Sequence, residues 1–287
     1  MAVGRRFDAP LLLIGAALKS RIATAVVLAS VVIAALLLLP VLWLNLVLAL
    51  LLLVAGGWEA TRLAGLRAPL AQAVWIAGLC AAGAGTVWLA HEPANVPRML
   101  ATAVGAWIPL AAWLLRPELG RAGADRFQPL KLLIVGAVLL AAFFSISWLH
   151  VYNPWSVIYL IGLIAAADIG AYFSGYRFGG RKLAPRISPG KTWSGAVGGL
   201  LAAMAAAALA SPLVPGVPFG PAVAACGAAV LVVLSVCGDL VISLLKRHRG
   251  LKDTSNLLPG HGGMLDRVDS LAAAAPAFAL LIWWYTG

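Results

Sequence analysis

The sequence predicts an all-α protein with about nine helices that cross a membrane. Of its 287 residues, 62% are hydrophobic and only 11% are charged, whereas soluble domains carry roughly 25% charged residues. Apolar runs of about 18 or more residues recur along the chain, and each is long enough to cross roughly 30 Å of hydrocarbon. A soluble fold could bury one or two such runs. A transmembrane barrel would instead show alternating segments of about ten residues.

Nine apolar segments are candidate spans, and turns that carry breakers such as Pro40, Pro69 and Pro129 separate them. A signal peptide would be followed by a soluble domain, but here more spans follow, so we interpret the first run as a retained helix. Residues 10–20 are too short to span and are expected at the membrane interface. The predicted spans are 22–39, 41–57, 70–90, 98–115, 130–149, 154–175, 192–212, 220–244 and 268–285.

The basic residues of the loops predict the orientation of the chain. With these spans, 20 of the 21 Lys and Arg residues fall on one side, and only Arg98 falls on the other. Because Lys and Arg gather in cytoplasmic loops, we expect the N-terminus to be cytoplasmic and the C-terminus to lie on the far side. The chain is therefore expected in the inner (plasma) membrane, with the lipid bilayer as a partner. The same distribution explains the net charge of +11 without a nucleic-acid partner.

The chain divides into two parts. Residues 1–150 hold about five spans with short loops and scattered charge, whereas residues 151–287 hold about four spans and the two long cytoplasmic loops. The C-terminal part also holds the carboxylates that stand inside or at the ends of spans, so we expect the chemistry there. No internal repeat is obvious, and an inverted-repeat transporter gains no direct support. The three cysteines show neither the spacing of a zinc site nor a disulfide framework.

Two carboxylates lie within apolar runs, namely Asp168 and Asp239. A charge at bilayer depth costs several kcal/mol unless it is paired, hydrated or bound to a metal. Both residues precede a cytoplasmic loop by roughly two turns of helix, so each is expected to face a cavity that opens to the cytoplasm. The alternative is an ion pair between helices that only stabilises the bundle.

A second pair of carboxylates, Asp266 and Asp269, stands three residues apart at the start of the last span. If a helix begins near Asp266, both lie on one face of its first turn. Capping at the positive end of the helix dipole explains one aspartate comfortably but two less so. Together with Asp239 they would repel one another unless a cation sits among them. Mg²⁺ prefers such oxygen ligands, together with a substrate phosphate.

The loops supply cations and flexible backbone. The preference of basic residues for the cytoplasm explains perhaps half of the cations, but it does not explain SPGKTW at 188–193. There a Ser-Pro-Gly turn is expected to place Lys191 and Thr192 at the start of a helix, where amides, a lysine and a hydroxyl make a phosphate site.

The segment PGHGG at 259–263 is rich in glycine, which lets backbone approach a ligand closely. His261 within it is interpreted as a phosphate donor, with a plain turn residue as the alternative. Carboxylates for Mg²⁺, cations for several phosphates and a site in the membrane together predict phosphoryl or nucleotidyl transfer onto a lipid.

The stretch SLLKRHRGLKDTSNLLPGHGGMLDRVD, residues 243–269, closely resembles the signature of the phosphatidate cytidylyltransferases, or CDP-diacylglycerol synthases. The stretches 167–193 and GDL at 238–240 are also similar to that family, and the likeness covers about residues 150–287. The positions in register with the signature are Ser243, Lys246, Arg247, Lys252, Asp253, Pro259, His261, Gly262, Gly263, Asp266, Arg267 and Asp269.

The resemblance implies transfer of CMP from CTP to phosphatidic acid, which gives CDP-diacylglycerol and pyrophosphate for phospholipid biosynthesis. It implies Mg²⁺, as a metal pair or with a second cation, at Asp239 and Asp266, the positions that physical reasoning also selects. The catalytic residues are then Asp239, Asp266, Asp269, Lys252 and Asp253. The substrate-binding residues are Lys191, Arg186, Ser188, Thr192, Lys246, Arg247, His261, Gly262, Gly263, Arg267 and Asp168.

Two positions depart from the family pattern. Ile242 stands where many members have an acidic residue, and Ser194 stands where many have Glu or Gln. The departures concern one polar contact near the site and leave the metal pair intact. The alternatives are another Mg²⁺-dependent membrane transferase and a transporter for a phosphorylated solute, which would carry charges at both faces. A homodimer is one option for the assembly of the chain.

Overall fold

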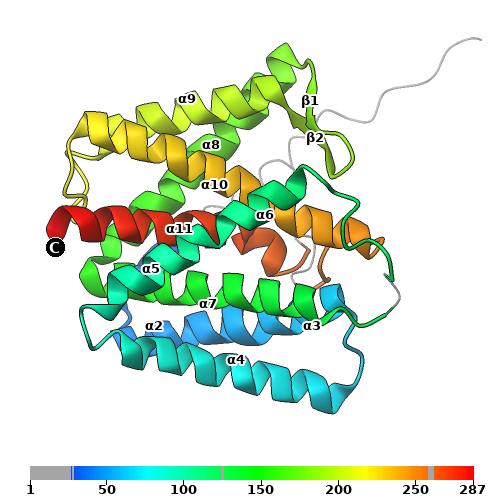
Figure 1. Cartoon of the computed structure of the whole chain (residues 1–287). Coiled ribbons are helices and arrows are strands. Elements are labelled where there is room, and N and C mark those ends of the chain that lie inside the picture. The colour runs from blue at the N-terminus through cyan, green and yellow to red at the C-terminus, as the bar shows by residue number, and fades with distance from the viewer. Residues whose placement is uncertain (1–26, 28, 124–125, 258–261) are drawn as a thin grey trace, which may run out of the picture.

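The protein, seen in a computed structural model, is built almost entirely of helices (Figure 1). The structure describes residues 27, 29–123, 126–257 and 262–287. The predicted all-α membrane fold is confirmed, and within these ranges the only sheet is a two-stranded hairpin. The elements are α2 (Val41–Leu48), η1 (Ala49–Gly56), α3 (Gly57–Ala64), α4 (Pro69–Leu89), α5 (Asn95–Gly105), α6 (Trp107–Leu114), α7 (Pro129–Tyr152), α8 (Pro154–Phe178), β1 (Lys182–Ala184), β2 (Ser188–Thr192), α9 (Trp193–Ala210), α10 (Pro221–His248) and α11 (Leu265–Thr286).

Seven helices in the described part of the chain are long and apolar enough to cross a membrane. One of them is continuous from Val41 to Ala64 and comprises α2, the π-helical η1 and α3. The predicted count of nine is not confirmed. The first predicted span, 22–39, contains the short helix Ala29–Leu38, and its residues 22–26 and 28, like the interfacial segment 10–20, lie outside the described residues.

The predicted span 98–115 is not one helix but two. α5 ends at Gly105 and α6 begins at Trp107, with a turn at Ala106 between them. Pro109 explains the break, because proline has no amide to donate to the carbonyl of Gly105 and its ring crowds that carbonyl. Glycine is in addition a weak helix former.

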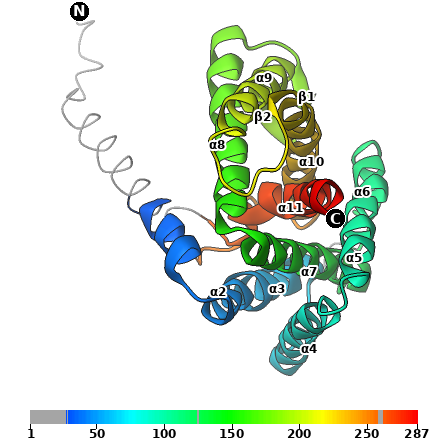
Figure 2. The same cartoon turned by 90° about the vertical axis from the view of Figure 1, so that its left-hand side faces the viewer.

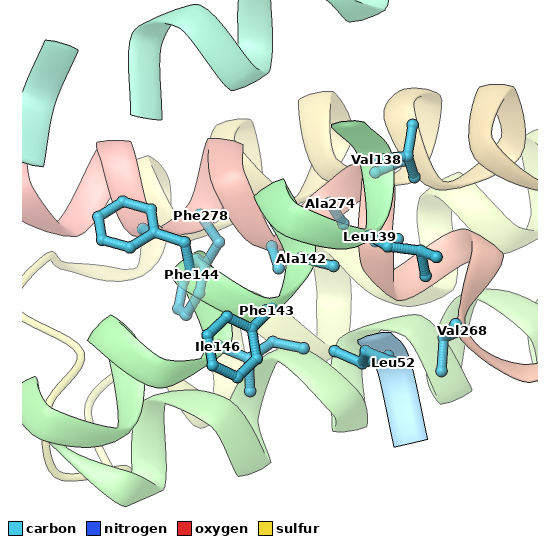
Figure 3. Packing of buried hydrophobic residues seen from close by; sticks show 14 of the residues in the cluster. Leu52, Val138, Leu139, Ala142, Phe143, Phe144, Ile146, Val268, Ala274 and Phe278 are labelled. Carbon is cyan, nitrogen blue, oxygen red and sulfur yellow. The ribbon is translucent and has the colours of Figure 1, made fainter. Parts of the chain in front are cut away.

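α7 is the central helix of the bundle. It contacts α11, α8 and α4 as well as the continuous helix Val41–Ala64, and in Figure 2 α2–α4 lie on one side of it while α8, α9 and α10 gather on the other. Figure 3 shows Leu139 and Phe143 of α7 packed among Leu52 of η1 and Val268 and Phe278 of α11. Helices in a membrane associate through such close packing and not through the hydrophobic effect. This core therefore joins the N-terminal helices to α11.

α8 and α9 approach each other closely through small residues. A Cβ atom added at Gly170 would lie 2.8 Å from the carbonyl oxygen of Gly198, and one at Gly199 would lie 2.6 Å from the carbonyl oxygen of Ala167. Real Cβ atoms do not come so near, so the glycines are what permits this backbone contact, as in other small-residue interfaces between membrane helices.

The basic loops lie together at one end of the bundle, on the right-hand side of Figure 1. They also bond to one another: His248 of α10 is 2.6 Å from the carbonyl oxygen of Pro117, and Gln128 N donates to Ala64 O at 2.8 Å. Arg186 at the hairpin forms an exposed ion pair with Glu118 at 3.0 Å. The predicted segregation of the loops therefore has a structural counterpart, whereas the side of the membrane on which they lie stays a prediction.

Candidate active site

Two cavities that share Asp168 lie towards the end of the bundle that carries the basic loops. The hairpin cavity, about 500 Å³ in volume, lies between α8, the β1–β2 hairpin, α9 and α10, and Lys182, Lys191, Thr192 and Tyr176 are among its lining residues. The acidic cavity, about 360 Å³, lies between α8, α10 and α11. Asp168 of α8 lines both. The polar residues of the acidic cavity are Asp168, Asp239, Lys246, Asp266, Arg267, Asp269 and Ser270.

Asp239 lies on α10, two and a half turns before the end of that helix. Its Oδ2 is 2.5 Å from Nζ of Lys191, which comes from β2, and its Oδ1 accepts a hydrogen bond from Ser243 Oγ at 3.0 Å. The preceding Gly238 has a packing role, because a Cβ atom there would collide with Asp269 O on α11. The glycine thus lets α10 approach α11 at the turn where the two aspartates meet.

Asp266 lies in the first turn of α11, as the sequence predicts. Its Oδ1 is 2.6 Å from Nζ of Lys246, and the two side chains are only 8% and 11% exposed. Its Oδ2 accepts hydrogen bonds from the amides of Thr254 and Gly263 at 2.8 and 3.0 Å. Asp266 therefore joins α11 both to α10 and to the loop that precedes α11.

The remaining two carboxylates differ in exposure. Asp269 is buried and accepts a hydrogen bond from the amide of Ser270 at 2.7 Å, whereas Asp168 is exposed towards both cavities. The three carboxylates that the sequence analysis expects to converge, Asp239, Asp266 and Asp269, all line the acidic cavity, and Asp168 joins them there. The alternative of a purely structural ion pair between helices has no support at Asp168, for which no ion pair is found within the described residues.

The segment 188–193 differs from its prediction. Lys191 is not at the start of a helix but in β2, which pairs antiparallel with β1. α9 begins at Trp193, and Thr192 is its N-cap. The hydroxyl of Thr192 accepts a hydrogen bond from Gly195 N at 3.1 Å and lies 3.1 Å from Ser194 Oγ. Thr192 therefore lines the hairpin cavity while it caps the helix, as such hydroxyls commonly do.

Several predicted substrate-binding residues, and the predicted catalytic residues Lys252 and Asp253, lie away from both cavities. Arg186 pairs with Glu118 and is 75% exposed, and Arg247 Nε donates to Ile187 O at 3.2 Å, which ties α10 to the hairpin. The loop residues Lys252 and Asp253 are exposed to solvent. His261 lies outside the described residues. Of the described part of the predicted set, the residues that line neither cavity are Arg186, Ser188, Arg247, Lys252, Asp253, Gly262 and Gly263.

The two residues that depart from the family pattern, Ile242 and Ser194, make contacts that the structure describes fully. Ile242 is 1% exposed and belongs to the main apolar core, so it faces packed side chains. Ser194 donates a hydrogen bond to Gly179 O, and this bond ties the start of α9 to the end of α8.

Sequence reasoning missed one carboxylate. Glu59 of α3 is fully buried and accepts a hydrogen bond at 2.7 Å from the amide of Leu265, the first residue of α11. The available signal was a carboxylate at the end of an apolar run, in GWEATR. It lies in the part of the chain that was expected to hold only spans.

The described residues contain no group of three or more His, Cys, Asp or Glu side chains close enough to hold a metal ion. Instead, the carboxylates of Asp239 and Asp266 each contact a lysine ammonium. A cation thus already lies beside each of the two predicted metal ligands.

Comparison with known proteins agrees with this chemistry. A sequence model described as the Cytidylyltransferase family matches residues 19–285. A phosphatidate cytidylyltransferase of Pseudomonas aeruginosa is 40% identical over 234 residues, which cover 79% of this chain and 83% of that protein. Shorter matches are 48% identical to the Haemophilus influenzae phosphatidate cytidylyltransferase (43% of this chain, 44% of that protein) and 51% identical to that of Brucella suis (46% and 49%).

Carboxylates and cations meet at the ends of apolar helices, and together with the matched family and relatives they identify a membrane-embedded nucleotidyltransferase. The chain belongs to the cytidylyltransferase family.

Proposed function

We propose that the acidic cavity and the hairpin cavity together form the place where this enzyme makes CDP-diacylglycerol. The enzyme transfers the CMP group of CTP to phosphatidic acid and releases pyrophosphate, a step of phospholipid biosynthesis. The observation that carries the location is the acidic cavity, in which carboxylates of α8, α10 and α11 face Lys246 and Arg267.

The position of the cavities suits two substrates of opposite solubility. CTP comes from water and phosphatidic acid stays in the bilayer, so the site must open to both. The acidic cavity is lined by Ile161, Ile164 and Leu271 besides its charged residues. An apolar wall beside a charged one suits a lipid headgroup whose acyl chains remain in hydrocarbon, and the hairpin cavity is left for the nucleotide.

The two cavities are joined by Lys191. This residue lines the hairpin cavity, yet its Nζ is 2.5 Å from Asp239 Oδ2 in the acidic cavity. We propose that the α-phosphorus of CTP lies near this contact, where a phosphate oxygen of phosphatidic acid attacks it in line. The new P–O bond forms as the bond to pyrophosphate breaks, and no strong base is needed because phosphatidic acid is already ionised.

We propose that Asp239 and Asp266 hold a divalent cation during the reaction. Asp239 and Asp266 offer oxygen ligands of the kind that Mg²⁺ prefers, and the lysine ammoniums beside them occupy the positions that a cation favours electrostatically. When bound, Mg²⁺ would neutralise phosphate charge at Asp239 and Asp266. Lys191 and Lys246 would then move from the carboxylates to the phosphates and stabilise the charge of the departing pyrophosphate.

Other residues have roles that follow from their places. Asp168 and Asp269 would orient the cations from the remaining walls of the acidic cavity, and Arg267 would meet the lipid phosphate. Lys252, Asp253 and His261 remain predictions that rest on the family signature. So do Arg186 and Ser188 of the hairpin segment and Arg247 of α10.

The proposed location of the protein rests on the proposed site and on the distribution of its basic residues. We propose the inner membrane, with the hairpin and the loop before α11 in the cytoplasm where CTP is found. Labelling of single introduced cysteines on the hairpin and after α11, in intact and in permeabilised cells, measures this orientation. A homodimer is a separate prediction, and light scattering of the purified protein measures it.

The reaction is tested with purified protein, labelled CTP, phosphatidic acid and Mg²⁺. We expect a labelled lipid product, its loss on removal of divalent metal and its return when Mg²⁺ is added. Asp239→Asn and Asp266→Asn should abolish the product, with Glu92→Gln on the opposite end of the molecule as the matched control. A labelled lipid formed at the normal rate by either aspartate variant would contradict the assignment of the site.

A further inference from the structure

Glu59 is a buried carboxylate that α3 contributes to a loop almost 200 residues further along the chain. Its residue exposure is 0%. Oε1 accepts hydrogen bonds from Ser255 Oγ at 2.5 Å and from Met264 N at 2.8 Å. Oε2 accepts from Thr254 Oγ1 at 2.9 Å and from Leu265 N at 2.7 Å. Each oxygen therefore lies within hydrogen-bond distance of two donor groups, and the single proton of the Thr254 hydroxyl is shared with Asp266 Oδ2.

These bonds fix the start of α11. The amides of Met264 and Leu265 are at the N-terminal end of that helix, where backbone amides have no partner within the helix. A negative charge is favourable at this end because the helix dipole is positive there. Glu59 therefore caps the N-terminus of α11 from another helix, whereas a capping side chain normally belongs to the residues next to the helix start.

The same loop also holds Asp266. Thr254 donates through its amide to Asp266 Oδ2 at 2.8 Å, and its hydroxyl is 2.9 Å from both Asp266 Oδ2 and Glu59 Oε2. Thr254 therefore lies between the two carboxylates. Glu59 reaches Asp266 by two routes, through this threonine and through the first turn of α11.

Gly263 gives an independent sign that this contact is tight. A Cβ atom at Gly263 would lie 2.5 Å from Glu59 Oε1 and would also collide with Thr254 Oγ1. Real Cβ atoms do not come so near, so any larger residue would have to displace Glu59 or the loop. One glycine of the signature thus serves the approach of Glu59, in addition to any contact with a ligand.

We infer that Glu59 is a positioning residue for the transferase reaction: it sets the place of Asp266 through Thr254 and the start of α11. The inference rests on the proposed role of Asp266 in the reaction. Residues that orient a metal ligand without touching the metal commonly change metal affinity or activity about 10- to 100-fold when they are replaced.

The test compares Glu59→Gln with Glu59→Asp and with the exposed control Glu92→Gln. We expect Glu59→Gln to lower kcat by about 10- to 100-fold and to raise the Mg²⁺ concentration for half-maximal rate, because an amide cannot accept all four bonds. Glu59→Asp should recover part of the rate, and Glu92→Gln should equal the wild type. Hydrogen exchange without metal or substrate should be faster at Met264 and Leu265 in Glu59→Gln.

Two results would overturn the inference. One is a Glu59→Gln protein with wild-type kcat and Mg²⁺ dependence. The other is a loss of rate that only follows the loss of folded protein, with unchanged Mg²⁺ dependence. If Glu59→Gln does not fold, Ser255→Ala removes one of the four donors and must still raise the Mg²⁺ requirement and the exchange rate. A wild-type protein that forms no lipid product would refute the proposed function instead. The hydrogen-exchange measurement distinguishes the two cases, because it reports the Glu59 contacts without the reaction.

Discussion

Replacing Asp266 by asparagine should both destabilise the protein and stop the reaction. Lys246 and Asp266 are 11% and 8% exposed, and their charged atoms are 2.6 Å apart. Loss of one partner leaves the other charge buried without compensation, which costs about 3–5 kcal/mol. For a chain of this size, each kcal/mol shifts the unfolding temperature by roughly 2–4 °C, so we expect a decrease of about 6–20 °C.

The assay is thermal unfolding in detergent, followed by far-UV circular dichroism, alongside CMP transfer at saturating CTP. The double variant Asp266→Asn with Lys246→Met removes both charges, so it should recover most of the stability but none of the activity. Glu118→Gln is the matched control, because its partner Arg186 is 75% exposed and such surface pairs contribute only about 0–1 kcal/mol.

The reasoning is refuted if Asp266→Asn unfolds at the wild-type temperature. It is also refuted if the double variant regains activity together with stability, because Asp266 would then have only a structural role.

Two further variants, each with a control variant, test the geometry of the site. Gly238→Ala places a methyl group against Asp269 O on α11, so it should cost about 1–3 kcal/mol of unfolding free energy and lower the rate. The control is Gly162→Ala, because an added Cβ atom there would have no neighbour within 4 Å. It should raise the free energy of unfolding by up to about 1 kcal/mol. Equal unfolding temperatures for Gly238→Ala and Gly162→Ala would contradict the packing argument. Lys191→Met should lower kcat about 100-fold in steady-state kinetics. Its control, Arg177→Met, replaces an exposed cation and should keep the wild-type kcat. Similar kcat values for the two variants would exclude Lys191 from the site.

The acidic half of the site could be predicted because its physics is local. A carboxylate in an apolar helix is costly unless it is compensated, so Asp168 and Asp239 are conspicuous in the sequence. The spacing of Asp266 and Asp269 places both on one helical face once the helix start is known. Helices long enough to cross the membrane were equally evident from apolar length, although Gly105 and Pro109 divide one of them.

The partners of these carboxylates could not be predicted. The contact of Lys191 with Asp239 joins a hairpin to α10, and that of Lys246 with Asp266 joins α10 to α11. Such pairs depend on how separate helices pack. The hairpin itself was missed because SPGKTW carries turn residues next to a helix start, and two short strands of three and five residues leave little periodic signal.

The sequence by itself determined that this is a membrane-embedded helical protein with carboxylates inside or at the ends of its late spans, because hydrocarbon imposes length, composition and compensation of charge on every segment separately. Its family signature indicated the enzyme. Only the tertiary structure decided which cation contacts which carboxylate. It also decided that Gly238 permits the close approach of α10 to α11, and that Glu59 accepts hydrogen bonds from the start of α11. The physical reason is that a span can be recognised alone, whereas a contact between distant spans arises only when the whole bundle is packed.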